Sequence, residues 1–204
     1  MKIQRAGDSA LLVETGDLET SHRLHATLRD RPLPGIVDIV PGERTVLVVA
    51  AGPVHLDQVT IGLQELSLHE DLGERVDSLE ISVVYDGADL EEVADLTGFS
   101  REEVVRRHSE SVYTVAYLGF SPGFGYLTGL DPALHVSRRE SPRTAVPAGS
   151  LAIAGPYAAV YPSRSPGGWR LLGRTEVPLW DVTRDPPSLL RPGTRVHFVP
   201  EEPC

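Results

Sequence analysis

Arg143 and Arg174 are the residues of this 204-residue sequence best suited to binding an anion. Each adjoins a residue typical of turns, Pro142 or Gly173. A guanidinium group can bind a carboxylate or a phosphate through two parallel hydrogen bonds. We therefore predict that both arginines bind the anionic part of a ligand and that Arg174 takes part in catalysis. The alternative is that each arginine donates structural hydrogen bonds to loop carbonyls.

His108 is the second candidate for catalysis. Ser100 and Glu103 have the spacing of a helix capping box, and His108 falls at the end of the helix that they predict. The negative end of the helix dipole would favour the charged imidazolium form. A role in the site and a role in capping the helix are equally compatible with this position.

An aromatic loop is the most distinctive local feature. Residues 117–127 contain three glycines, a proline and four aromatic residues, which excludes a helix and indicates tight turns. Phe120, Phe124 and Tyr126 share parity, so an extended chain would present them on one face. Such a loop suits a binding surface, and the alternative is a barrel corner with buried aromatics. Trp169 follows two glycines and would cover a pocket or close the barrel end.

Several kinds of chemistry lack support in the sequence. The pattern Gly119-x-Ser121-x-Gly123 matches a hydrolase nucleophile motif, but the helix that must follow such a serine is not expected here. The histidines do not have the spacing of metal ligands. Lys2 is the only lysine, so a P-loop or Schiff-base lysine is not expected elsewhere. The net charge of −10 argues against a general nucleic-acid-binding protein.

The elements that must position these residues form two groups. Alternating apolar runs and helical spacing predict a small α+β domain over residues 1–84, with helices across 17–29 and 56–66. Two short helices follow, with Asp89 and Ser100 as expected N-caps. Beyond residue 112, short apolar runs alternate with glycine and proline turns, which is typical of a β-barrel or sandwich. Residues 85–204 are therefore predicted to form a helical connector and a β-barrel domain.

The cell compartment follows from what the sequence lacks. No apolar run approaches the roughly 20 residues of a membrane helix. The first residues have no signal-peptide core. Cys204 is the only cysteine, which leaves no internal disulfide. We expect a cytoplasmic protein without a membrane partner.

Four ordered motifs carry a resemblance to a known family. They are Gly-Phe-x-Pro-Gly-Phe-x-Tyr-Leu, Pro-Arg-x-x-Val-Pro-x-Gly-Ser, Ser-Pro-Gly-Gly-Trp and Gly-Arg-Thr, all between His108 and Phe198. In this order they resemble the family of the 5-oxoprolinase B subunit, also called KipI-like or allophanate hydrolase subunit 1-like. The resemblance implies a cyclophilin-like barrel after the α+β domain. The residues expected to contact substrate are Phe120, Phe124, Tyr126, Arg143, Ser150, Tyr157, Tyr161, Ser165 and Trp169.

The activity implied by the resemblance is that of one subunit of an ATP-dependent 5-oxoprolinase, which opens the lactam of 5-oxoproline to glutamate. It implies a companion cyclophilin-like subunit, leaves a third subunit open, and lets ATP bind with or on a partner. Two alternatives stay open. One is a regulatory inhibitor of a sensor histidine kinase, and the other is a carboxyltransferase-type component of a urea carboxylase or allophanate hydrolase system.

The sequence departs from the family pattern at three positions. Ser137 precedes Arg138 where relatives commonly have proline before arginine. Tyr157 and Ala159 stand where relatives commonly have glutamine and glycine. A tyrosine offers one hydroxyl in place of an amide donor and acceptor. If the family glutamine contacts substrate, we expect either a changed substrate preference here or a partial loss of the activity.

Overall fold

The chain divides into two compact units, Met1–Arg75 and Val76–Cys204. The computed structural model describes residues 1–68 and 78–202, so Cys204 lies outside them. The sequence predicted a boundary after residue 84. The strand β5 (Ser78–Val83) instead belongs to the second unit, because it pairs along its whole length with the C-terminal strand β13 (Arg195–Pro200).

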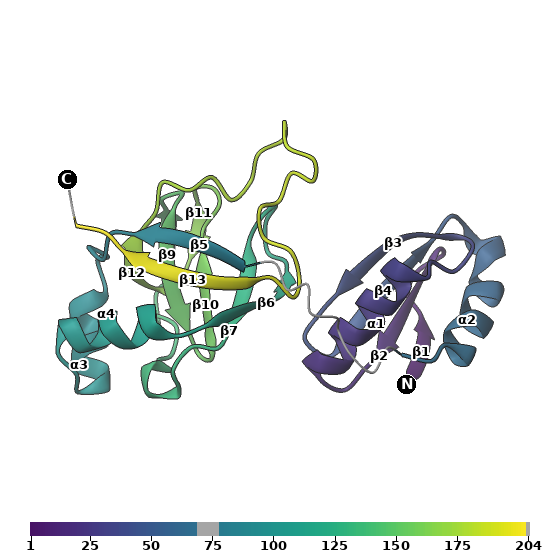
Figure 1. Cartoon of the computed structure of the whole chain (residues 1–204), viewed down its shortest axis with the longest axis horizontal. Helices are drawn as coiled ribbons and strands as arrows, with labels where there is room; N and C mark the ends of the chain where they lie inside the picture. The colour runs from purple at the N-terminus through teal and green to yellow at the C-terminus, as the bar shows by residue number, and fades with distance from the viewer. Residues whose placement is uncertain (69–77, 203–204) are drawn as a thin grey trace. The chain divides into compact units, whose positions relative to one another are not determined.

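The first unit is a four-stranded antiparallel sheet with two helices (Figure 1). The strand order is β1-β2-β4-β3, and the helices pack against the sheet through a single apolar cluster. Asp17 caps α1 by accepting a hydrogen bond from the Thr20 N–H at 2.7 Å, and Leu24 and Leu28 are fully buried, as their helical spacing predicted. The elements are β1 (Lys2–Arg5), β2 (Ala10–Glu14), α1 (Leu18–Asp30), β3 (Ile36–Pro41), β4 (Thr45–Ala50), η1 (Pro53–His55) and α2 (Leu56–Glu65).

The second unit is a nearly closed, barrel-like sheet. Seven strands are ordered β12-β9-β10-β7-β6-β13-β5, and the β-bridge between Val84 and Arg174 joins the two edges of the sheet. The β-strands β8 and β11 form a separate two-stranded sheet. The predicted α+β class with a barrel-like second part is confirmed. The remaining strands are β6 (Tyr113–Leu118), β7 (Gly125–Thr128), β8 (Arg143–Val146), β9 (Ser150–Ala154), β10 (Tyr157–Val160), β11 (Ser165–Gly167) and β12 (Arg170–Arg174).

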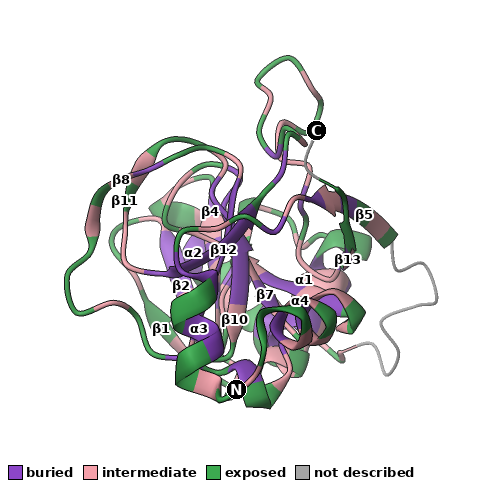
Figure 2. Ribbon diagram, turned by 90° about the vertical axis from the view of Figure 1, so that its left-hand side faces the viewer, coloured by how far each residue is buried: buried purple, intermediate pink, exposed green. Residues whose placement is uncertain are grey.

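The barrel closes where glycine allows two backbones to meet. A Cβ on Gly173 would overlap the carbonyl oxygen of Val84, the residue that bridges to Arg174. Paired backbone hydrogen bonds of 2.9 Å join Val84 and Arg174. Figure 2 shows that β12 is largely buried on one side of this closure, whereas β5 on the other side is mostly exposed or half-buried. Only a residue without a side chain fits this junction.

Two short helices, α3 (Leu90–Thr97) and α4 (Arg101–Glu110), connect β5 to the rest of the barrel, and the 3-10 helix η2 (Pro132–Leu134) contacts both. Ser100 caps α4 as predicted, by accepting a hydrogen bond from the Glu103 N–H at 3.2 Å. Asp89 does occupy the N-cap position of α3, but its side chain makes no capping hydrogen bond, so the predicted side-chain cap is wrong. Its carboxylate binds arginine side chains instead.

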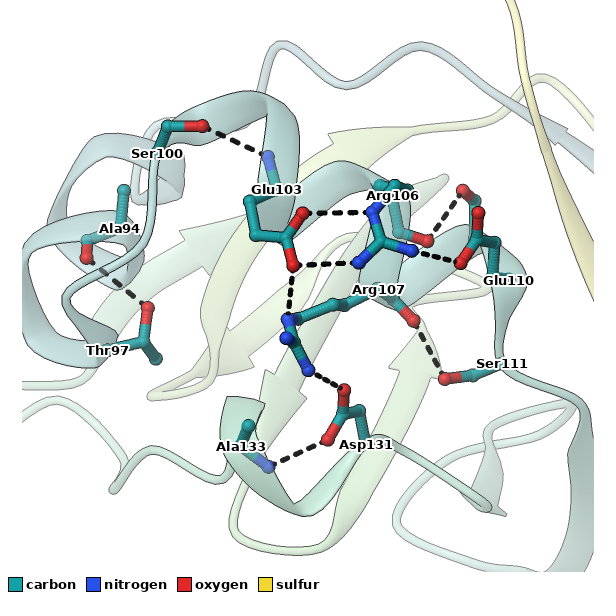
Figure 3. A network of polar contacts seen from close by, with 11 residues as sticks. Ala94, Thr97, Ser100, Glu103, Arg106, Arg107, Glu110, Ser111, Asp131 and Ala133 are labelled. Atoms are coloured by element: carbon teal, nitrogen blue, oxygen red, sulfur yellow. Dashed lines mark hydrogen bonds and ion pairs between the residues drawn. The ribbon is translucent and has the colours of Figure 1, made fainter.

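The arginines of α4 are held within a local charged network (Figure 3). Arg106 binds Glu103 at 2.7 Å, and Arg107 binds Glu103 and Asp131, each at 2.7 Å. These ion pairs tie α4 to the η2 segment. The two guanidinium groups therefore serve the connector, and Arg107 also stacks on the Phe99 ring at 4.5 Å.

No helix within the described residues has both the length and the apolar character needed to cross a membrane.

Candidate functional site

The predicted aromatic residues meet in one cluster, which we call the aromatic cluster. Its ring centroids lie 5.1 to 6.4 Å apart in edge-to-face contacts, an arrangement that aromatic quadrupoles favour. These rings come from the loop before β7, from β7, from β10 and the residue after it, and from the residue that precedes β12. The members predicted from the sequence are Phe120, Phe124, Tyr126, Tyr157, Tyr161 and Trp169. Tyr117, which was not predicted as a site residue, joins them by stacking on Tyr126 at 4.6 Å and contacting Tyr157 at 6.1 Å.

Phe120, Phe124 and Tyr126 do not meet in the way that their alternate positions in an extended chain predicted. The backbone turns between Gly119 and Phe124, with the Gly119 N–H donating to the Phe124 carbonyl at 3.1 Å. Phe124 is buried, whereas Phe120 is 60% exposed. Phe120 also has a φ of 66°, in the left-handed region that non-glycine residues rarely adopt. The structure thus holds one aromatic ring toward solvent on a strained backbone, an arrangement associated with functional sites.

The Pro-Gly-Gly-Trp motif positions the Tyr161 hydroxyl. A Cβ on Gly167 would overlap this hydroxyl, so the first glycine makes room for it. Burial raises the pKa of Tyr161, while the Trp169 N–H and the charge of Arg138 act in the opposite direction. Tyr161 is therefore a neutral phenol at physiological pH, held against the β11–β12 turn.

Arg143 does not face a free anion site, because it binds a carboxylate of the chain itself. Its two terminal nitrogens donate to Asp89 Oδ2 and Oδ1 at 2.9 and 2.7 Å. Arg139 Nη1 and the Leu171 N–H also donate to this carboxylate, each at 2.7 Å. Asp89 is 1% exposed. Burial would raise the pKa of Asp89, but the hydrogen bonds from Arg143 and Leu171 outweigh it and lower the pKa.

A second carboxylate extends this ion-paired group. Glu92 contacts Arg139 at 3.4 Å and forms an ion pair with Arg170. We call these residues the Asp89 cluster; they are Asp89, Glu92, Arg139, Arg143 and Arg170. It joins α3 to β8 and β12 and so holds the two-stranded sheet to the barrel. The alternative considered for Arg143, a structural hydrogen bond, describes its contacts better than ligand binding, although the partner is a carboxylate.

Arg174 lies apart from the aromatic cluster, at the end of β12. It binds Asp86 at 2.9 Å and Glu176 at 3.4 Å, and its side chain is 50% exposed. It borders a cavity of about 400 Å³ that Ser82, Thr175, Val177 and Glu201 also line. Arg174 is thus available to an anion only in competition with two carboxylates.

His108 lies in the barrel core. Its ring is fully buried and contacts Tyr85, Tyr113 and Phe198 at centroid distances of 5.1 to 5.7 Å. Its Nδ1 forms a hydrogen bond of 2.9 Å with the Tyr85 hydroxyl. Burial lowers the pKa of His108 to about 3, so the expectation of a charged imidazolium is wrong. Desolvation in the core outweighs the helix dipole, and the ring has no surface with which to meet a substrate.

The predicted serines occupy different settings. Ser150 is buried at the start of β9, where its carbonyl accepts a hydrogen bond from the Tyr161 N–H at 2.9 Å. Ser165 has a buried hydroxyl without a hydrogen-bond partner among the described residues. Ser121 shares this property, and its turn is followed by β7 instead of the helix that a nucleophile motif needs. Within the described residues, no three side chains of metal-ligating type are grouped to hold an ion.

Comparison with known proteins places this architecture in a class. A family model described as carboxyltransferase domain, subdomain C and D, matches residues 1–190. The structure of TTHA0988 superimposes with a TM-score of 0.85 at 37% identity, and this chain spans 97% of its own length but 41% of that protein. A conserved uncharacterised protein from Pyrococcus horikoshii, PH0987, is 36% identical with a TM-score of 0.61, each chain being covered to 98%.

The curated relatives are more specific. The chain is 43% identical to the B subunit of 5-oxoprolinase from Escherichia coli O157:H7, over 83% of this chain and 80% of that protein. It is 35% identical to the B subunit of 5-oxoprolinase from Bacillus subtilis, over 97% and 92%. The chain therefore belongs to the family of the 5-oxoprolinase B subunit. The urea amidolyase of Saccharomyces cerevisiae is 25% identical, and the chain spans 13% of it.

Sequence reasoning missed the Asp89 cluster. The pairs Asp89–Arg143 and Asp89–Arg139 are separated by 54 and 50 positions in the chain, so no local spacing could reveal them. The only signal was an acidic residue at a predicted helix start, and it was interpreted as a cap.

Proposed function

We propose that this chain is the subunit of an ATP-dependent 5-oxoprolinase that contributes the binding surface for 5-oxoproline and acts with a companion subunit. The observation that carries the proposal is the 43% identity to a protein named as the B subunit of 5-oxoprolinase, over 83% of this chain. Opening the lactam needs activation because the amide is stable. Phosphorylation of the lactam oxygen by ATP would create a better electrophile for water and would yield glutamate, ADP and phosphate.

The aromatic cluster supplies the flat apolar surface for this reaction. The plane of a lactam ring can lie against an aromatic face or edge, and Phe120 and Tyr126 retain contact with solvent for this purpose. The Tyr161 hydroxyl is neutral and can donate or accept one hydrogen bond. These groups would bind and orient the lactam and would exclude water from its apolar edge.

We propose that ATP binds to a companion subunit, either entirely or at a site shared with this chain. A phosphate-binding site needs cationic side chains or a cradle of backbone N–H groups. Around the Asp89 cluster, Arg139, Arg143 and Arg170 are already bound to Asp89 or Glu92, and the neighbouring Arg138 is left, within the described residues, for a site shared with a partner. The only lysine, Lys2, belongs to the other unit. Arg174 could contact a phosphate only after leaving Asp86.

The test is a reconstitution with omissions. The chain is co-expressed and purified with the companion subunits of the same enzyme system, and glutamate formation from 5-oxoproline is followed with and without ATP. We expect ATP-dependent glutamate from the assembled complex and none from this chain alone. The two other functions considered, kinase inhibition and a role in urea degradation, would leave 5-oxoproline unconsumed. An assembled complex that consumes none would therefore refute the proposal.

A further inference from the structure

The loop that leads into β8 has a backbone fixed on both sides of Arg138. The Gly155 N–H donates to the Val136 carbonyl at 2.8 Å, and Arg170 Nε donates to the Ser137 carbonyl at 3.3 Å. The Arg139 N–H donates to the Gly168 carbonyl at 2.8 Å. Arg138 therefore projects from a backbone that is held by two other segments, the β9–β10 turn and the start of β12 with the residues just before it.

The side chains of Arg138 and Arg139 have different environments. Arg139 binds Asp89 at 2.7 Å and is half-buried. Arg138 is exposed, and its guanidinium carbon lies 5.8 Å from the ring centroid of Trp169. Among the described residues, no carboxylate lies within ion-pair distance of Arg138. Within the described part of the chain, Arg138 is thus a guanidinium group beside the aromatic cluster without an anionic partner, while Arg139, Arg143 and Arg170 have theirs.

Arg138 reaches the aromatic cluster through Trp169. The Trp169 ring contacts Phe124 at a centroid distance of 5.7 Å, and Phe124 contacts Tyr161 at 5.3 Å and the exposed ring of Phe120 at 5.2 Å. Burial raises the pKa of Tyr161, and the charges of Arg138 and Arg143 both act against this rise. A cation, a phenol and an exposed apolar ring therefore belong to one connected group of contacts. A small molecule with both an anionic group and a flat apolar part would be complementary to this combination.

We propose that Arg138, and not Arg143, binds the carboxylate of a small planar carboxylic acid whose ring lies on the aromatic cluster. The inference rests on the proposed function for the choice of 5-oxoproline as the probe. A free guanidinium group can offer two parallel N–H donors to a carboxylate. The fixed backbone reduces the conformational entropy that Arg138 loses on binding. In the absence of ligand, the Trp169 ring stabilises the guanidinium group by a cation–π contact. Arg143 is less suited to this role, because its two terminal nitrogens already form a bidentate pair with Asp89.

Trp169 allows a local binding assay. The chain has two tryptophans, so Trp180→Phe leaves Trp169 as the only indole that reports on the site. Three full-length proteins are compared: Trp180→Phe and its Arg138→Ala and Arg195→Ala derivatives. Each is titrated with 5-oxoproline and with pyrrolidin-2-one, the same lactam without the carboxylate, and binding is followed by the fluorescence of Trp169. Arg195 is an exposed arginine on β13 and serves as the charge-matched control.

We expect Arg138→Ala to weaken 5-oxoproline binding by about 10- to 150-fold, the range for loss of a charge-assisted contact. Binding of pyrrolidin-2-one should be the same in all three proteins, and Arg195→Ala should bind both probes as its parent does. Equal affinity of Arg138→Ala and its parent for 5-oxoproline would overturn the inference. So would an equal loss for both probes, which indicates a structural effect, or a parent protein that does not distinguish the probes.

The same variants separate this inference from the proposed function. If the assembled complex forms glutamate equally well with Arg138→Ala at 5-oxoproline concentrations far below saturation, the function stands and the inference fails. If binding depends on Arg138 but the assembled complex forms no glutamate, the inference stands and the proposed function fails.

Discussion

Asp89 is the residue on which the charged side of the candidate site depends. Its buried carboxylate accepts hydrogen bonds from Arg143, Arg139 and the Leu171 N–H. Four donors to one carboxylate satisfy its oxygens, which is the condition under which a buried charge is tolerated. Asp89 thereby fixes the position of β8 and of the segment that carries Arg138. It is not itself proposed to contact the substrate.

The first prediction concerns the loss of this charge. Asp89→Asn should lower the free energy of unfolding by at least about 2 kcal/mol, because two arginines lose their counter-charge in a partly buried setting. The loss should stay below the about 3–5 kcal/mol of a fully buried pair, since both arginines retain some contact with water. Urea denaturation gives the value. Glu91→Gln, on an exposed ion pair of the same helix, is the control and should have little effect; equal destabilisation by the two variants would contradict the assigned role.

The second prediction concerns the pH dependence of stability. The pKa of His108 is about 3 in the folded protein and has an ordinary value of 6.5 in the unfolded chain. The folded state therefore binds fewer protons, so the contribution of His108 is fully present above pH 6.5 and is lost as the pH falls from 6.5 toward 3. His108→Phe should flatten the fall in stability between pH 6.5 and 4, measured by urea denaturation at each pH. His135→Gln, an exposed control, should keep the wild-type slope; an unchanged slope in His108→Phe would disprove the assignment.

At the scale of elements, the loop between β6 and β7 combines a strained backbone with an exposed ring. Phe120 has a φ of 66°, and its ring makes edge-to-face contacts with Phe124 and Tyr161. An L-residue with a side chain is disfavoured in the left-handed region by about 1–2 kcal/mol, and glycine is not. The turn chemistry of residues 117–127 could be predicted from the sequence, but the conformation of Phe120 could not.

The third prediction isolates this strain. Phe120→Gly and Phe120→Ala both remove the ring contacts, so their difference reports the backbone alone. We expect Phe120→Gly to be the more stable variant by about 1 kcal/mol in urea denaturation. A Phe120→Ala protein that equals or exceeds Phe120→Gly in stability would show that the left-handed conformation is not retained.

Elements defined by local signals were predictable, and those defined by distant contacts were not. Ser100 caps α4 as its spacing with Glu103 indicated. Asp89 has a similar local sequence, but its carboxylate binds arginines about fifty positions away. His108 occupies the expected helix end, yet the burial that decides its charge comes from Tyr113 and Phe198 on other strands. The family motifs identified most of the aromatic residues that meet. They did not reveal which arginine near these residues lacks an ion pair with a carboxylate.

At the scale of the whole molecule, each unit has its own apolar core. One cluster of buried residues lies within the first unit, around Leu24, Val46 and Leu63. Two lie within the second, around Phe198 and around Trp169. A unit with its own core and a complete sheet meets the usual requirements of an independent domain.

The fourth prediction follows from these separate cores. Residues 76–204 expressed without the first unit should fold and unfold cooperatively in urea, because β5 and β13 are both retained. Residues 85–204, the second domain as predicted from the sequence, lack β5 and should be markedly less stable. Circular dichroism during denaturation distinguishes the two fragments. Equal stability of both fragments would indicate that β5 is dispensable and would restore the boundary after residue 84.

Under the proposed function, this chain is one subunit of an enzyme that couples ATP hydrolysis to opening of a lactam. The most direct measurement is ADP release by the purified complex of co-expressed subunits, with and without 5-oxoproline. We predict that 5-oxoproline stimulates ADP release and that glutamate appears in equal amounts, while this chain alone releases none under the same conditions. ADP release that is indifferent to 5-oxoproline, with no glutamate formed, would contradict the account.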